Sequence, residues 1–381
     1  TGVQTGSVHT GAELTVVQLL PALQGGGVER GTLEVAGELV RRGCRSIVIS
    51  DTGRLVPELL STGSEHVCWS IGRKSAASLR WIRPLRRFLA EQRVDILHAR
   101  SRLPAWIAWL ALCGMAPAQR PHFVTTVHGL YSINAYSAVM LRGERVIAVS
   151  RHARDYILSG YPEVDPGRIR VIPRGIDTAC YMQGYRPDDA WQAGWYRRYP
   201  QTWERFVVTL AGRPTRSKGL LDFIDIVGRL KGQGIPVHGL IVGDIPAARE
   251  SRVRRLLACA LERADAGSAV TLTGFRSDLR EIMAISGAVV SLSLHPESHG
   301  RSVSEALALG RPVAGYGHGG VGEQLSGLFP EGCVAVGDRE AMAGRLADWY
   351  RQPPSLEGVT PWPLSRTLDE TLRLYRDLAG R

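Results

Sequence analysis

Short runs of hydrophobic residues alternate with longer amphipathic segments along most of the chain. In the first half these runs are rich in Val, Ile and Leu and are bounded by polar residues or glycines. Strands that are buried on both faces have nearly continuous apolar sequences, and their alternation with helical segments is typical of βαβ units. The pattern predicts a doubly wound parallel sheet with strands at residues 14–20, 46–50, 95–98, 123–127, 145–149 and 170–173.

The alternation lapses between about residues 178 and 205, where Tyr, Trp, Pro and charged residues dominate, and it then resumes. Further apolar runs, predicted to be strands, lie at 206–211, 237–242, 270–273, 288–294, 312–316 and 333–336. A length of 381 residues suits two domains better than one. We therefore expect an α/β fold with two Rossmann-like, doubly wound parallel-sheet domains. The predicted parts are a tail at 1–12, an N-terminal domain at 13–186, a C-terminal domain at 187–352, and a crossing segment with a terminal helix at 353–381.

The composition is that of a globular protein, with 44% hydrophobic and 22% charged residues. No apolar stretch is long enough to span a bilayer; the nearest, at 103–116, is broken by Gly114 and is interpreted as a buried helix. Residues 1–12 lack the charged and apolar regions of a secretory signal. The six cysteines are widely spaced without a C-x-x-C pair, which argues against zinc and disulfides and favours the reducing cytoplasm.

Much of the formal net charge of +11 comes from the N-terminal half, where arginines cluster at residues 73–93. Arg80, Arg83, Arg86 and Arg87 are interleaved with apolar residues, so the segment is predicted to be a basic amphipathic helix. Pro84 would kink it unless that residue lies in the first turn. Such a helix fits an anionic membrane surface, a nucleic acid or an ordinary solvated face, and the sequence leaves these alternatives open.

Three glycines, Gly25, Gly26 and Gly27, follow the first predicted strand and precede a predicted helix. Backbone amides in such a turn can approach a phosphate without obstruction by a Cβ atom. The triplet is also a near miss to the dinucleotide fingerprint, and Asp51 follows the second strand as that fingerprint requires. A tight turn, a phosphate loop and a dehydrogenase-like site are all compatible with the triplet alone.

Two charged segments in the second half also follow predicted strands. Arg213 offers a planar guanidinium and Lys218 a mobile ammonium, and both suit a diphosphate. Glu297 and Glu305 lie beside the predicted start of a helix. If the stretch between them were wholly helical, about 1.5 Å per residue would separate the carboxylates by roughly 12 Å. The four side chains therefore predict a site for one elongated ligand, a nucleotide sugar, with its diphosphate at the helix N-terminus.

With these motifs the chain resembles the retaining glycosyltransferases of family 4, which have the GT-B fold of two Rossmann-like domains facing across a cleft. The resemblance covers almost the whole chain. It is carried, in the family's order, by Gly25-Gly26-Gly27-Val28-Glu29-Arg30, Thr126-Val127-His128-Gly129, Val146-Ile147-Ala148-Val149-Ser150, Val171-Ile172-Pro173-Arg174-Gly175-Ile176-Asp177, the loop with Arg213 and Lys218, and the pair Glu297 and Glu305.

The resemblance implies catalytic roles for four residues. Arg213 and Lys218 would stabilise the departing diphosphate, Glu297 would position the hexose, and His128 would face the donor sugar from the N-terminal domain. It also implies donor contacts by Gly26, Gly27, Gly300, Arg301, Ser302 and Glu305, the last of these on the ribose. The segment at 317–323 matches a family segment near the nucleotide sugar, and the terminal helix is expected to return to the N-terminal domain.

Three positions depart from the family pattern. Ser298 and His299 replace a Gly-Phe pair between the two glutamates, so the donor hexose is left open. Gly129 stands where the family often has Asp, which leaves His128 without an evident orienting partner. Arg174 stands where the family often has Asn, and the sequence gives no account of it.

The resemblance implies a retaining enzyme that moves a hexose-type sugar from a nucleoside diphosphate donor, with UDP as the first expectation. The expected acceptor is a membrane-associated glycan or glycolipid such as lipopolysaccharide core. Retention through a covalent Glu297 intermediate and through same-face attack are both open. No D-x-D triplet occurs, so neither a metal nor another cofactor is expected. The expected location is the cytoplasm, with peripheral attachment to the inner face of its membrane as an extension.

Two other functions are compatible with parts of the sequence. A nucleic-acid-binding protein would explain the excess of basic residues, although we expect no nucleic-acid partner. A nicotinamide-dependent oxidoreductase would explain Gly25 to Gly31 and Asp51, but it would leave the four charged residues of the second half without a role. The sequence does not indicate an oligomeric state.

Overall fold

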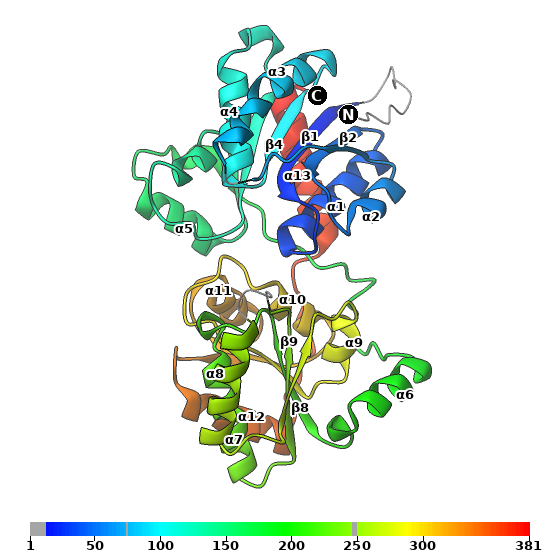
Figure 1. The fold of residues 1–381 in the computed structure, drawn as a ribbon, viewed down its shortest axis with the longest axis vertical. Coiled ribbons are helices and arrows are strands. Elements are labelled where there is room, and N and C mark those ends of the chain that lie inside the picture. Colours follow the sequence, from blue (N-terminus) through cyan, green and yellow to red (C-terminus); the bar gives the residue numbers. More distant parts are fainter. Residues whose placement is uncertain (1–12, 74, 246–249) are drawn as a thin grey trace. The chain divides into compact units, whose positions relative to one another are not determined.

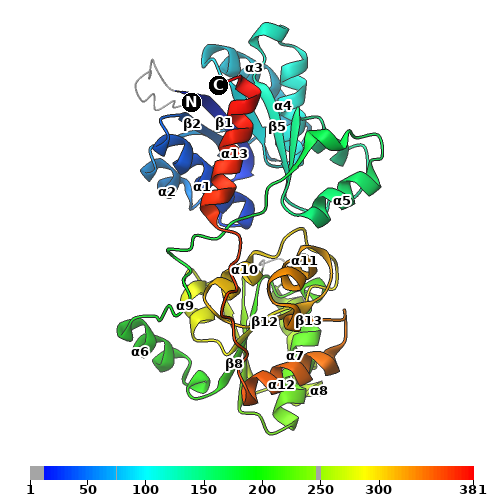
Figure 2. The same ribbon diagram turned by 180° about the vertical axis from the view of Figure 1, so that it is seen from behind.

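The structure is a computed structural model that describes residues 13–73, 75–245 and 250–381. The predicted tail at 1–12 and Lys74 of the basic segment lie outside the described residues. The chain divides into two compact units, which Figures 1 and 2 show from opposite sides. Unit 1 consists of Thr1–Arg174 with Ser365–Arg381, and unit 2 is Gly175–Leu364. Each unit is described by itself.

Unit 1 is built on a parallel sheet of seven strands in the order β3-β2-β1-β4-β5-β6-β7. Six of these strands lie at the predicted places, and β3 was not predicted. It is an edge strand with the sequence Glu-His-Val-Cys and no fully buried residue, so it lacks an apolar run. The strands are β1 (Thr15–Ala22), β2 (Arg45–Asp51), β3 (Glu65–Cys68), β4 (Ile96–Ala99), β5 (His122–Val127), β6 (Arg145–Ala148) and β7 (Ile169–Val171).

Helices cover both faces of this sheet because alternate strand residues point to opposite sides. Val17 and Leu19 of β1 pack in a core with the helices α3, α4 and α5, whereas Leu20 packs with α1 and α2. Figure 2 shows α13 crossing the same face as α1. The helices of unit 1 are α1 (Gly27–Arg41), α2 (Val56–Ser61), α3 (Ile82–Glu91), α4 (Arg102–Cys113), α5 (Arg151–Gly160) and α13 (Leu364–Ala379).

The predicted basic helix is a short 3₁₀ segment, η1 (Ala76–Trp81), followed by α3. Pro84 lies in the first turn of α3, where its missing N–H group is tolerated. Arg83 is exposed, but Arg86 is partly buried and donates from Nε to the carbonyl of Ala111 at 3.2 Å. Arg86 of α3 therefore packs against α4 and is not part of a free basic face. Of the helices in the described ranges, none is long and apolar enough to cross a bilayer.

A buried polar contact fastens α13 to the sheet of unit 1. Tyr375 Oη lies 2.6 Å from His98 Nδ1 on β4, and the other ring nitrogen of His98 lies 2.6 Å from Thr126 Oγ1 on β5. Burial raises the pKa of Tyr375 to about 12, so its hydroxyl keeps its proton for this contact. Because these groups are desolvated, breaking either contact leaves an unsatisfied buried atom. The terminal helix thus belongs to unit 1.

Unit 2 is built on a parallel sheet of six strands in the order β10-β9-β8-β11-β12-β13. The strands are β8 (Phe206–Ala211), β9 (Val237–Val242), β10 (Val270–Gly274), β11 (Ala288–Ser291), β12 (Val313–Tyr316) and β13 (Cys333–Val334). The helices are α6 (Asp189–Arg198), α7 (Leu220–Gly232), α8 (Glu250–Arg263), α9 (Leu279–Ala284), α10 (Arg301–Ala308), α11 (Gly319–Leu328) and α12 (Arg339–Arg351).

The first boundary between the units lies after residue 174, earlier than the predicted 186/187. Tyr181 and Tyr185, which precede the predicted boundary, pack against the core of unit 2, and the aromatic segment that follows them packs on the same unit. Trp195 and Tyr199 join a buried cluster with Leu240, and Trp191 donates to Asp278 at 2.8 Å. Residues that look like an irregular linker in sequence thus cover part of the second core.

The second boundary lies after residue 364 and not at 352/353. Leu356 is buried in the core of unit 2. The backbone N–H of Ile176 donates to Trp362 at 2.9 Å, and that of Leu364 donates to Ile176 at 2.8 Å. The proline-rich segment is therefore held in unit 2 by a short parallel bridge, and the chain crosses to unit 1 only at α13.

Candidate functional site

In unit 1, the predicted site residues Gly27 and His128 meet Arg174, which departs from the family pattern, near the ends of strands. Gly27 starts α1, His128 follows β5, and Arg174 follows β7. Arg174 Nη2 lies 2.8 Å from His128 Nδ1. A Cβ atom on Gly27 would lie 2.6 Å from Arg174 Nη1. The glycine loop therefore leaves room for a guanidinium, and that guanidinium contacts the histidine.

His128 is neutral in this setting. Burial, and after it the charges of Arg174 and Arg100, hold the pKa of His128 well below its usual value. Arg174 is a donor, so the Nδ1 atom that it contacts accepts and the ring proton sits on Nε2. Arg174 is thus the orienting partner that the sequence did not reveal, because the two residues are far apart along the chain.

If His128 acts as the resemblance implies, Arg174→Ala should lower kcat/KM about 10- to 100-fold, the usual effect of losing a group that orients a functional side chain. The pKa of His128 should rise in this variant, because a depressing charge is removed. Steady-state kinetics with an NMR titration of the histidine ring would measure both. Arg154→Ala on α5 is the matched control. An unchanged His128 titration in Arg174→Ala would contradict the assigned contact.

The histidines of unit 1 also predict a pH dependence of stability. Burial is the main cause that holds the pKa values of both His98 and His128 well below 6.5. Below about pH 6.5 the unfolded chain gains protons that the folded chain does not, so stability is complete above that pH and falls as pH falls. The slope should approach about 1.4 kcal/mol per pH unit for each histidine.

Urea titrations between pH 7.5 and 5 would measure this slope. His98→Gln, which keeps a hydrogen-bonding side chain, should lower this slope by the contribution of one histidine, about 1.4 kcal/mol per pH unit. A slope that is equal in wild type and His98→Gln would show that this histidine does not stay neutral in the fold.

In unit 2, the two charged loops meet. Lys218 Nζ lies 2.7 Å from Glu297 Oε1, and the side chains are 37% and 25% exposed, so the pair is accessible to a ligand. The backbone N–H of Leu294 donates to Ser217 at 2.8 Å and joins the loops that follow β8 and β11. Gly219 has φ 76°, and a Cβ atom there would lie 2.2 Å from the Leu292 carbonyl oxygen. Only glycine allows the turn that places Lys218.

Glu297 is held by the glycine-rich segment at 317–320. Ser293 donates its hydroxyl to Glu297 Oε1, and His318 Nε2 contacts the Ser293 carbonyl at 2.7 Å. The N–H of Gly320 donates to the Glu297 carbonyl at 2.6 Å. Gly319 has φ 60°, and a Cβ atom there would lie 2.7 Å from Glu297 backbone atoms. Sequence reasoning noted this segment but missed Ser293 and His318, which orient the carboxylate.

The helix α10 begins directly after this loop. Its N-cap, Gly300, has φ 88°, and a Cβ atom there would lie 2.6 Å from Val321 Cγ2. The first N–H groups of a helix have no intrahelical partner and carry partial positive charge, so the α10 start, with Ser302 in its first turn, suits an anion. Because α10 starts at Arg301, the stretch from Glu297 to Glu305 is not wholly helical, and the assumption behind the 12 Å estimate does not hold.

Glu305 is paired within α10. Arg301 Nε lies 2.9 Å from Glu305 Oε1, and the glutamate side chain is only 10% exposed. The charge of Arg301, predicted to add a phosphate contact, is thus partly balanced by its neighbour one turn on. His299, predicted to line the sugar pocket, is buried.

Arg213 lies apart from these pairs. It follows β8 and is exposed, and within the described ranges it forms no ion pair. The structure therefore brings together Lys218 with Glu297 and Arg301 with Glu305, while Arg213 contacts neither pair. Its guanidinium is available to an anion.

Comparison with known proteins identifies two domains. The family model "Glycosyltransferase Family 4" matches residues 25–179, and "Glycosyl transferases group 1" matches residues 205–352. A curated relative, 2-deoxystreptamine N-acetyl-D-glucosaminyltransferase of Streptomyces fradiae, is 32% identical over 189 residues, which are 46% of this chain and 43% of that protein. The chain spans less than half the length of the curated relatives it matches.

Solved structures match over nearly the whole chain. A glycosyltransferase from Rickettsia africae is 26% identical with a TM-score of 0.80, covering 96% of this chain and 98% of that one. Anabaena HepE, solved with UDP and glucose, is 17% identical with a TM-score of 0.80, covering 96% and 100%. The predicted GT-B fold class, with its two Rossmann-like domains, is confirmed. The two family models together cover most of the chain, which is therefore a glycosyltransferase with a Family 4 domain followed by a group 1 domain.

Proposed function

We propose that the protein is a retaining glycosyltransferase that moves a hexose-type sugar from a nucleoside diphosphate donor, UDP-linked by first choice, to an acceptor. The observation that carries the proposal is the 2.7 Å contact between Lys218 and Glu297, made by two loops that lie beside the start of α10. The cation and the helix N-terminus suit the diphosphate of a nucleotide sugar, and the carboxylate suits its hexose.

The proposed reaction breaks the bond between the anomeric carbon and the diphosphate oxygen. Negative charge then grows on the diphosphate, where Lys218, Arg213 and the N–H groups at the start of α10 would stabilise it. Positive charge grows at the anomeric carbon, where Glu297 would stabilise it. Glu305 would hold the ribose. The cations would supply the charge that a metal supplies elsewhere, so we propose a metal-independent reaction.

In unit 1, neutral His128 with its Nε2–H and the Gly26/Gly27 loop are the residues proposed to contact the donor. A neutral imidazole can donate a hydrogen bond to a sugar hydroxyl without adding charge near the anomeric carbon. In one route to retention, Glu297 displaces the diphosphate to form a bond with the anomeric carbon, and the acceptor hydroxyl then displaces Glu297. In the other, the acceptor hydroxyl bonds to the anomeric carbon on the face that the diphosphate leaves. In both routes the hydroxyl proton would pass to an oxygen of the departing diphosphate.

For the acceptor we propose a membrane-associated glycan or glycolipid, such as lipopolysaccharide core, reached from the cytoplasmic face. Support comes from the surface at η1 and α3, where Arg80 and Arg83 are exposed and Leu79 is 50% exposed. Exposed basic and apolar side chains together favour anionic membrane surfaces. Arg80→Glu with Arg83→Glu should reduce cosedimentation with phosphatidylglycerol vesicles. Equal binding by this variant and wild type would contradict the membrane proposal.

A thermal-shift panel of UDP, GDP, ADP and NAD tests the donor class. UDP should raise the melting temperature most, with and without EDTA, because the diphosphate is proposed to bind without a metal. Hydrolysis of UDP-sugars by the enzyme alone would then identify the hexose. Stabilisation by NAD only would favour an oxidoreductase, and DNA or RNA binding without nucleotide preference would favour the nucleic-acid alternative.

A further inference from the structure

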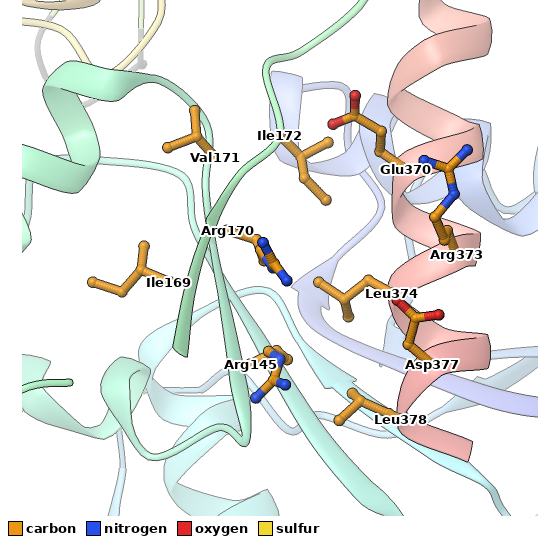
Figure 3. A pocket seen from close by; sticks show the side chains of 10 residues that line it. All are labelled: Arg145, Ile169, Arg170, Val171, Ile172, Glu370, Arg373, Leu374, Asp377 and Leu378. Carbon is orange, nitrogen blue, oxygen red and sulfur yellow. The ribbon is translucent and has the colours of Figure 1, made fainter. Parts of the chain in front are cut away.

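A hollow of about 390 Å³ lies in unit 1, on the sheet face that α13 crosses. The Tyr375 contact with His98 holds α13 to β4, and the hollow lies between α13 and the sheet's last strands, β6 and β7. Figure 3 shows side chains from these strands on one side of the hollow and side chains from α13 on the other. None of its lining residues belongs to the site proposed above.

Three arginines line the hollow from both sides. Arg145 comes from the start of β6, Arg170 from β7 and Arg373 from α13. Arg145 donates to the backbone carbonyl of Glu144 at 3.1 Å. In the part of the chain that the structure describes, none of the three forms an ion pair with a carboxylate. Guanidinium groups that line a concave surface without carboxylate partners are suited to a phosphate, which a guanidinium can bind with two parallel hydrogen bonds.

The α13 side of the hollow adds hydrogen-bond acceptors, and apolar side chains also line the hollow. Glu370, Arg373 and Asp377 are three and four residues apart on α13 and so share one helix face. The Asp377 carboxylate can accept hydrogen bonds from hydroxyls, and Glu370 shares its carboxylate with Arg366 Nε at 3.2 Å. Leu374 and Ile172 provide apolar contact. Three guanidiniums and two carboxylates line the hollow, and Arg366 beside Glu370 adds a further cation, so positive charge exceeds negative charge. This balance suits an anion that also carries hydroxyl groups better than a bare anion or an apolar molecule.

We propose that this hollow is a binding site for a phosphate monoester of a polyhydroxy compound, of about the size of a hexose phosphate. Its volume is in the range of small-molecule sites, at roughly 300–1,000 Å³. The phosphate lies among the arginines and the hydroxyls face the α13 carboxylates. The same chemistry occurs in a free sugar phosphate and in a phosphorylated polyol headgroup of a lipid. The site is independent of the proposed donor site, whose charged residues lie in unit 2.

Calorimetric titration with glucose 6-phosphate, in saturating UDP to block the donor site, tests the proposal. Wild type should bind it saturably, and glucose without a phosphate should not bind. The Arg170→Ala/Arg373→Ala variant should bind at least tenfold more weakly. The corresponding double lysine variant, which keeps the charges but loses the planar fork, should lose less. Arg255→Ala, an exposed arginine of α8, is the matched control and should bind as wild type does.

Vesicles distinguish the two sources of the phosphate. Preferential cosedimentation with phosphatidylinositol 4-phosphate over phosphatidylglycerol vesicles of equal charge, lost in the double alanine variant, assigns a lipid headgroup. Saturable glucose 6-phosphate binding without that preference assigns a free metabolite. Binding of neither probe, equal binding of glucose, or binding that the double alanine variant retains would overturn the site. Circular dichroism of both double variants shows that any loss of binding occurs in folded protein.

Discussion

Glu297→Gln is expected to lower kcat about 10²- to 10³-fold, the usual effect of removing one group that stabilises transition-state charge. Glutamine has nearly the same shape and can still accept the hydrogen bond that Ser293 donates. It lacks the negative charge that pairs with Lys218 and that is proposed to act at the anomeric carbon. Because the carboxylate is proposed to act on charge that develops during the reaction, kcat should fall far more than donor affinity. Steady-state kinetics and UDP titration measure the two effects separately.

Glu262→Gln is the matched control, since this glutamate is exposed on α8 in the same unit and should leave kcat unchanged. Mass spectrometry of the wild-type enzyme incubated with donor alone distinguishes the routes to retention. A sugar adduct on Glu297 supports the covalent route, and an intact enzyme during turnover supports same-face attack. If Glu297→Gln retained wild-type kcat, the carboxylate would have no place in the reaction.

The sheets were predictable because their strands are buried on both faces. Runs such as Val207 to Leu210 are mostly apolar, and such runs predict a buried strand without knowledge of the rest of the fold. The exceptions are at edges. Strand β3 has a half-exposed sequence without an apolar run and was not predicted, and the apolar run predicted as a strand at 333–336 forms only the two-residue β13. The boundaries were misplaced because Tyr181, Tyr185 and Leu356 lie in irregular segments of the sequence but pack on the core of the second unit.

The candidate site was predictable where both partners follow strands of the same parallel sheet. Lys218 and Glu297 each follow a strand of a parallel sheet, and the carboxyl ends of such strands share one edge, so their meeting could be expected. The pairing of His128 with Arg174 could not. It depends on how the segment after β7 passes Gly27, and each residue taken alone had an ordinary structural interpretation. Side-chain partners across separate elements are fixed by tertiary packing, which no local spacing encodes.

Lys218→Met is expected to weaken binding of the UDP-linked donor about 10- to 100-fold, because a hydrogen bond to a charged group contributes roughly 1.5–3 kcal/mol. Methionine keeps most of the aliphatic length but removes the ammonium. The folded state should be little affected, since the contact with Glu297 is partly exposed and such pairs contribute only about 0–1 kcal/mol to stability. Lys231→Met is the control, because Lys231 pairs with Asp265 on the surface of the same unit.

The double variant, Lys218→Met with Glu297→Gln, decides what the lysine does. If Lys218 binds the diphosphate and Glu297 acts on the sugar, their effects on donor affinity and on kcat should nearly add, because each touches a different part of the donor. If the lysine served only to hold the carboxylate, the double variant would be no worse than Glu297→Gln alone. UDP affinity separates these cases most directly, because UDP lacks the hexose. An unchanged UDP dissociation constant in Lys218→Met would mean that the ammonium orients Glu297 and that Arg213 and the start of α10 hold the diphosphate without it.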